Sequence, residues 1–159
     1  MSIRHEMRRL RAEHDALATL SRILRDIVDQ PHPPRPTELR SVRGMLRDTL
    51  VRHLKCEDWV LYPRLKASGD AGLIRIATEF VDEVGDIATD FERYDGKWTE
   101  DRVDAEWPAF CRETRFVLDL LEIRIARENQ DLYPAVEALD VPETSLPRRA
   151  VRDGSTISS

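Results

Sequence analysis

Apolar residues recur at helical spacing along most of the chain, and this pattern predicts four long amphipathic helices. They are expected over residues 3–29, from 37 to a turn at 68–70, over 71–94, and from a start between 99 and 104 to about 139. In each helix, apolar positions three and four residues apart form one inward stripe. Four prolines in residues 30–36 favour an extended crossing between the first two helices, because proline cannot donate a backbone hydrogen bond.

Helices of this length joined by short links predict an all-α fold, an up-down-up-down four-helix bundle over residues 1–140. Thr37 is the expected N-cap of the second helix, and Ser2 that of the first. The inward stripe of the fourth helix comprises Phe110, Val117, Leu120, Leu121, Arg124, Glu128, Leu132 and Leu139. Residues 141–159 are rich in proline, arginine and serine and predict a disordered C-terminal tail.

Composition narrows the class of protein. The chain has 159 residues, of which 41% are hydrophobic and 35% charged, and this fits one charge-rich helical domain. A net charge of −5 without a basic block argues against nucleic acid as a partner. No apolar run suits a membrane helix or a signal peptide, so we expect no membrane partner and a cytoplasmic protein. Cys56 and Cys111 fit reduced thiols there.

Five residues with metal-binding or charged side chains fall within the inward stripes: His14, His53, Glu57, Arg124 and Glu128. Positions four residues apart share a helix face, so His53 and Glu57 can reach one metal ion. Taken singly, each residue has a plainer interpretation, His14 as a hydrogen-bonded core histidine and His53–Glu57 as a surface pair. A buried carboxylate without a partner costs several kcal/mol, so inward-facing Glu57 and Glu128 require a cation.

The spacing of His53 and Glu57 is unlikely to arise by chance, because the sequence around them is repeated later in the chain. The segment RHLKCEDWVLYPRL at 52–65 has a near-copy, RIARENQDLYPAV, at 124–136. Glu57 aligns with Glu128, and a Leu-Tyr-Pro sequence follows each of them at the same distance. The position of His53 is taken by Arg124 in the second copy.

A weaker match aligns residues 13–18 with 83–88 and sets Val84 at the position of His14. The chain therefore reads as a duplicated helix pair, with H…HxxxE in the first copy and V…RxxxE in the second. This pattern resembles the hemerythrin-like family, also called the HHE cation-binding domain, over about residues 3–139.

The resemblance implies a fold in which two H…HxxxE copies supply ligands to a non-haem di-iron centre that binds oxygen or related small molecules. Four residues match the family's metal-ligand positions: His14, His53, Glu57 and Glu128. Val84 and Arg124 replace two ligand histidines, and neither a valine nor a protonated guanidinium coordinates a metal. The retained residues are those expected around one iron and as bridging carboxylates, whereas both lost histidines would have served the other iron.

Arg124 is therefore the proposed stand-in for the second metal, with its guanidinium paired to Glu57 and Glu128. The sequence leaves three states open: a metal-free core, one Fe or other divalent metal such as Mn or Zn, and a dinuclear site that Asp86 or Glu83 would have to complete. The first two states predict different functions.

The favoured function is a hemerythrin-like binding, sensing or regulatory module with a lost or mononuclear metal site, acting as a homodimer or through a protein partner. The alternative is an enzyme, a mononuclear non-haem iron or manganese protein handling oxygen, peroxide or nitric oxide. Three tryptophans, Trp59, Trp98 and Trp107, are expected in the core or at helix ends rather than on a partner surface. Cys56 is expected to point away from the metal site, and His5 and His32 to be solvated.

Overall fold

The computed structural model describes residues 3–84 and 86–139, with the side chains of residues 83 and 84 excluded. All regular structure in this part of the chain is helical, in α-helices and two π-helical turns (η1, η2). The elements are α1 (Ile3–Val28), α2 (Pro36–Cys56), η1 (Glu57–Leu61), α3 (Tyr62–Ala67), α4 (Ala71–Val84), α5 (Ile87–Lys97), α6 (Glu100–Ala105), α7 (Trp107–Arg127), η2 (Glu128–Leu132) and α8 (Tyr133–Leu139). The predicted all-α class is confirmed for these residues.

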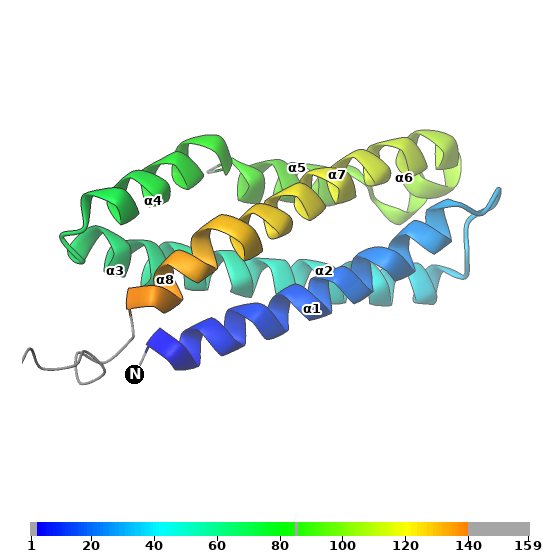
Figure 1. Cartoon of the computed structure of the whole chain (residues 1–159). Coiled ribbons are helices and arrows are strands. Elements are labelled where there is room, and N and C mark those ends of the chain that lie inside the picture. Colours follow the sequence, from blue (N-terminus) through cyan, green and yellow to red (C-terminus); the bar gives the residue numbers. More distant parts are fainter. Residues whose placement is uncertain (1–2, 85, 140–159) are drawn as a thin grey trace, which may run out of the picture.

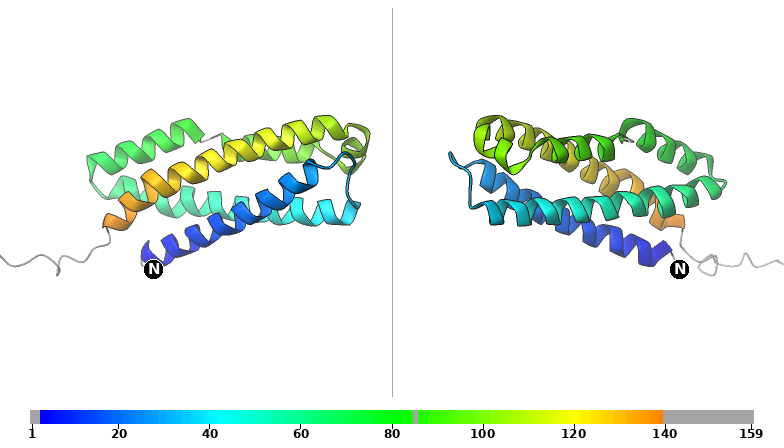
Figure 2. Two further views of the ribbon diagram at one scale, coloured as in Figure 1. Left: turned by 45° about the vertical axis from the view of Figure 1, so that its right-hand side comes forward. Right: turned by 180° about the vertical axis from the view of Figure 1, so that it is seen from behind.

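The long helices lie lengthwise beside one another (Figure 1). α1 packs against α2 and against α7, and α2 also contacts α5. Both views in Figure 2 place the start of α1, the α3–α4 turn and α8 at one end of the molecule, and the α1–α2 connection with α6 at the other. Among the described residues, no helix is both long and apolar enough to span a membrane.

The structure differs from the predicted helices at three points, although α6 begins at Glu100, within the start predicted for the fourth helix. The second helix begins at Pro36, with Arg35 rather than Thr37 at the N-cap, because the fixed φ of proline suits the first helical turn. The third predicted helix is two helices, α4 and α5, with Asp86 at the N-cap of the second. The fourth is also divided, since Thr99 caps the short helix α6 before α7 starts at Trp107. The predicted Ser2 cap and the tail at 141–159 lie outside the described residues.

The two π-turns occupy equivalent places in the two copies of the repeat. Each begins at the repeated glutamate, Glu57 or Glu128, and closes with an i→i−5 hydrogen bond from the tyrosine that follows the turn. A proline comes next, at 63 and at 134, and a proline ring clashes with the carbonyl four residues earlier in a regular α-helix. A wider turn before the proline relieves that clash, so the Leu-Tyr-Pro sequence accounts for both bulges.

The buried apolar residues form two clusters along the long axis. One contains most of the inward residues of α1, α2, α5 and α7, and the other contains those of α3, α4 and α8 with the start of α1. A layer of buried polar side chains from α1, α2, η1, α7 and η2 accompanies these apolar clusters. The bundle therefore holds a polar site in its interior.

Among the described side chains, most of the predicted inward positions are buried or partly buried, whereas Leu120 and Leu139 are 43% and 45% exposed. Leu118 is buried in place of Leu120, so the buried face of α7 is displaced from the predicted stripe. Trp98 and Trp107 are buried as expected, whereas Trp59 is 76% exposed on η1, because it lies two residues after inward-facing Glu57 and so on the opposite side of the helix.

Candidate metal centre

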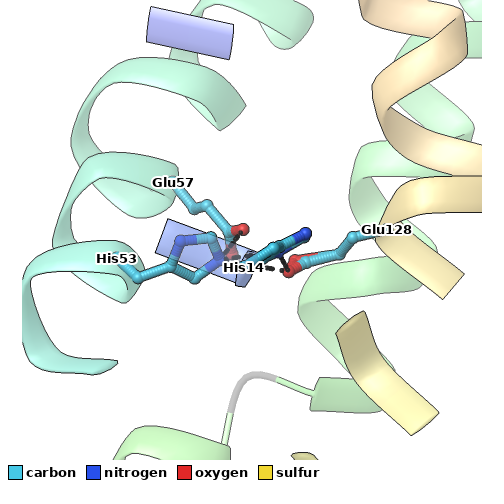
Figure 3. A group of neighbouring side chains, drawn as sticks. All are labelled: His14, His53, Glu57 and Glu128. Atoms are coloured by element: carbon cyan, nitrogen blue, oxygen red, sulfur yellow. Dashed lines mark hydrogen bonds and ion pairs between the residues drawn. The ribbon is translucent and has the colours of Figure 1, made fainter. Parts of the chain in front are cut away.

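Four side chains from three helical runs meet in the middle of the bundle (Figure 3). One nitrogen or oxygen atom from each lies within 4.8 Å of those of the others, and all four side chains are buried. These are the residues that the sequence predicted as ligands: His14 from α1, His53 from α2, Glu57 from η1 and Glu128 from η2. A candidate metal-binding group is thus assembled from the predicted residues.

The spacing of these atoms suits one metal ion. His14 Nε2 lies 3.1 Å from His53 Nε2, and each of these nitrogens is 3.3 Å from Glu128 Oε1. Glu57 Oε1 lies 2.7 Å from His53 Nε2. Ligands about 2.1 Å from a common ion are themselves about 3.0–3.4 Å apart in octahedral or tetrahedral geometry. Two imidazole nitrogens and two carboxylate oxygens therefore fit a single divalent cation.

Each histidine also has a polar partner on its outer nitrogen. His14 Nδ1 lies 2.8 Å from Asn129 Oδ1 and donates to it, and this contact leaves Nε2 directed at His53 and Glu128. His53 Nδ1 faces Glu13 Oε1 at 3.4 Å, an electrostatic contact whose geometry falls short of a hydrogen bond. Histidines that bind metals commonly have such a partner, which fixes the tautomer and the ring orientation.

Arg124 lies on the other side of the two carboxylates. Its Nη2 donates to Glu57 Oε2 at 3.0 Å, and its Nε is 3.7 Å from Glu128 Oε2. The side chain is 5% exposed, and both glutamates are fully buried. Each carboxylate thus directs one oxygen to the histidines and the other to the guanidinium. Arg124 links the two acids rather than forming a two-bond fork with either.

The electrostatics follow from this burial. Burial lowers the pKa of His53, but close contacts with the carboxylates of Glu128, Glu13 and Glu57 outweigh that effect and raise the pKa to about 11. Burial and the charge of Glu128 raise the pKa of Glu57. Burial also raises the pKa of Glu128, but hydrogen bonds from His14 and His53 outweigh it and hold that pKa below its usual range. Without a metal, a proton on His53 supplies positive charge at the centre of the group.

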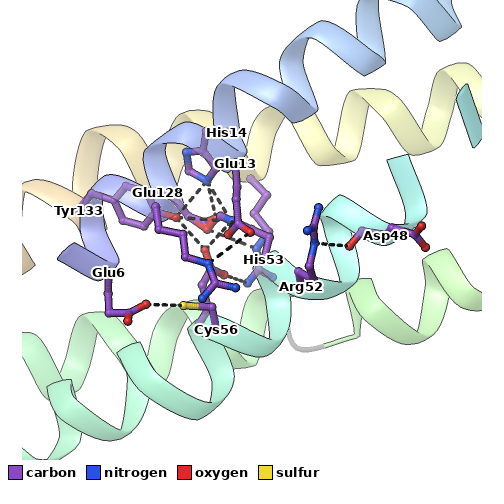
Figure 4. Close-up of polar contacts among 12 residues, drawn as sticks. Glu6, Glu13, His14, Asp48, Arg52, His53, Cys56, Glu128 and Tyr133 are labelled. Carbon is purple, nitrogen blue, oxygen red and sulfur yellow. Dashed lines mark hydrogen bonds and ion pairs between the residues drawn. The ribbon is translucent and has the colours of Figure 1, made fainter. Parts of the chain in front are cut away.

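Sequence reasoning missed two tyrosines at the site, although the repeated Leu-Tyr-Pro sequence was a signal for both. Tyr133 Oη lies within hydrogen-bond distance of three of the four ligand atoms (Figure 4). Tyr62 Oη accepts from Arg124 Nη2 at 3.3 Å. In a regular α-helix a residue five positions on lies about 140° away round the axis. The wider π-turn brings each tyrosine back towards the face of its glutamate.

The remaining histidines and Cys56 lie apart from this group. Cys56 is buried and its Sγ donates to Glu6 Oε2 at 3.4 Å, as expected for a residue that points away from the site. His5 and His32 are exposed. Asp86 is also exposed and caps α5, whereas the side chains of Glu83 and Val84 lie outside the described set.

Comparison with known proteins identifies the family. The sequence model described as the hemerythrin HHE cation binding domain matches residues 5–136. No curated protein and no solved structure matches the chain. The match covers most of the sequence and all of the candidate metal-binding group, and so the chain belongs to the hemerythrin HHE cation-binding domain family.

Proposed function

We propose that this protein is a hemerythrin-like binding or sensing module whose metal site is reduced to one cation, with Arg124 in place of the second. The observation that carries the proposal is the division of the carboxylate oxygens. Glu57 and Glu128 each have one oxygen among the histidine nitrogens and the other towards Arg124. Carboxylates that bridge two cations in a dinuclear site would divide their oxygens in the same way. The proposal includes an up-down-up-down order of the four helical runs α1, α2–α3, α4–α5 and α7–α8.

Two nitrogens and two carboxylate oxygens suit Fe²⁺, Mn²⁺ or Zn²⁺. When bound, iron or manganese would supply a coordination position for a small molecule. The chain's own residues hold this position dry and charge-balanced, because the donor side chains are buried and Arg124 offsets part of the carboxylate charge. Positive charge on Arg124 does not depend on metal, since a guanidinium stays protonated.

The four proposed ligand side chains are buried, and this favours binding or sensing of a small molecule over turnover of a larger substrate. A cavity next to Arg124, lined also by Leu54, Asp58 and Tyr62 but by none of the four proposed ligands, has a volume of about 30 Å³. That is space on the scale of a water molecule or a diatomic gas. The response would be read by a protein partner or a second copy of the chain, and exposed Trp59 lies on the same turn as Glu57. The alternative, redox chemistry on oxygen, peroxide or nitric oxide at the same ion, needs only a ligand of this size.

The metal-to-protein ratio tests the proposal directly. Protein purified without chelator and incubated anaerobically with Fe²⁺ should contain about one iron per chain. The double variant Val84→His with Arg124→His restores the two family histidines and should raise the ratio towards two. Arg127→His is the matched control, because it places a histidine one turn further along the same helical run without replacing Arg124.

Each other outcome overturns a stated part of the proposal. Two irons in the unchanged chain would exclude Arg124 as a substitute for a cation. No iron in the unchanged chain would leave a metal-free scaffold. A double variant with the same ratio as the unchanged chain would show that positions 84 and 124 are not the lost ligand positions.

A further inference from the structure

Tyr133 lies at the centre of the candidate metal-binding group. Its hydroxyl donates to Glu57 Oε1 at 2.9 Å and lies 3.0 Å from His14 Nε2 and 3.4 Å from His53 Nε2. These are the distances that the four ligand atoms keep among themselves. The phenol oxygen therefore belongs geometrically to the same set of donors.

The ring of Tyr133 is held on both faces. It stacks on His14 with centroids 4.8 Å apart and an interplanar angle of 12°, and the Arg11 guanidinium carbon lies 5.4 Å from the ring centroid. The residue is fully buried. Its hydroxyl cannot swing out of the site without unpacking this stack, so an ion held by the histidines would meet the phenol oxygen.

The charge of the ion indicates in which oxidation state that oxygen would bind. A trivalent ion brings one more positive charge into the buried site than a divalent ion does, and a phenolate would offset that added charge. Beside a divalent ion Tyr133 would keep its proton.

We propose that Tyr133 is a fifth protein ligand, which binds iron through its phenolate oxygen in the ferric state. This inference rests on the proposed mononuclear site. A one-electron oxidant such as ferricyanide would take one electron from ferrous iron, and the phenol proton would pass to the buffer as the iron–oxygen bond forms. Tyr62, the equivalent tyrosine of the first copy, hydrogen-bonds to Arg124 and does not ligate.

The experiment uses the full chain loaded anaerobically with Fe²⁺, oxidised with ferricyanide, which takes one electron per iron, and desalted. Unchanged protein should develop a visible phenolate-to-iron charge-transfer band, and resonance Raman excitation in that band should show phenolate ring modes. Tyr133→Phe keeps the stacked ring and should lose the band, with a shift of the iron reduction potential to a more positive value. Tyr62→Phe is the matched control and should keep both.

The outcomes separate failure of this inference from failure of the proposed function. Iron at one per chain without the band, or a band retained in Tyr133→Phe, overturns the ligand assignment and leaves the one-cation site standing. Absence of iron from every variant overturns the one-cation site, and the assignment of Tyr133 falls with it. The Raman measurement on the unchanged chain decides the question even where Tyr133→Phe does not fold.

Discussion

The two copies of the repeat have similar backbones, but at one inward position their side chains differ in chemistry. Both place a buried glutamate at the start of a π-turn and follow it with a tyrosine that turns back to the site. One turn before the glutamate, the first copy carries His53 and the second carries Arg124. The comparison shows that a single inward position decides whether a copy presents a metal ligand or a fixed cation.

The two residues neutralise the same carboxylates in different ways. His53 can give up a proton and coordinate, so its half of the site can exchange a proton for a metal ion. Arg124 is charged at every physiological pH and its guanidinium cannot bind a metal, so its half stays the same with or without one. In the proposed site, the family's two-cation arrangement would thus be divided into an exchangeable half at His53 and a permanent half at Arg124. Three predictions test this division.

The largest effect is expected from removing the permanent cation. Arg124→Met leaves Glu57 and Glu128 buried with less positive charge, and breaking a buried ion pair from one side costs about 3–5 kcal/mol of unfolding free energy. Urea denaturation of the metal-free protein measures this loss. Arg127→Met, a cation on the same helix that lies over Phe80, is the control and should cost below about 1 kcal/mol. Equal losses in the two variants would contradict the role given to Arg124.

A smaller effect is expected from removing the side chain of Asn129, the hydrogen-bond partner of His14. Asn129→Ala removes the acceptor that orients His14 and should weaken Fe²⁺ or Zn²⁺ binding by about 10–100-fold, the usual range for outer partners of metal-binding histidines. Competition with a chelator of known affinity measures the change. Gln130→Ala, the next residue on the same π-turn, should leave the affinity unaltered. A loss of the same size in both variants would point to the turn rather than to the hydrogen bond.

The smallest effect, counted per pH unit, is the pH dependence of stability in the metal-free protein. Because the folded-state pKa of His53 is raised to about 11, its stabilisation is complete below the unfolded value of about 6.5 and disappears as the pH rises to 11. The slope reaches at most about 1.4 kcal/mol per pH unit for one proton. The raised pKa of Glu57 acts in the same direction above about 4.5.

The lowered pKa of Glu128 acts at the other end of the range, with stabilisation present above about 4.5 and lost as the pH falls further. Chemical denaturation across pH 5–10 should therefore show stability falling with rising pH, and His53→Gln should flatten that fall. Arg124 adds no slope in this range. A fall of unchanged size in His53→Gln would assign the titration to other groups.

The sequence predicted much of the buried surface and of the site. The apolar stripes predicted most of the buried positions, and the stripes together with the resemblance to the hemerythrin-like family predicted that His14, His53, Glu57 and Glu128 would meet. Leu120 is exposed although the stripe included it, because it lies at the edge of that stripe and the neighbouring helices cover Leu118 instead. Trp59 was expected in the core or at a helix end, but it lies on the side of the helix opposite Glu57 and is exposed.

The sequence by itself determined which residues were available to the site, because spacing along a helix fixes which side chains share a face. Only the tertiary structure decided how the carboxylate oxygens are divided between His53 and Arg124, and that the Tyr133 hydroxyl reaches the ligand atoms. The contacts of Arg124 and Tyr133 with Glu57 join residues more than 60 positions apart. They depend on the axial register and rotation of packed helices, which follow from the filling of the whole core and not from any local pattern.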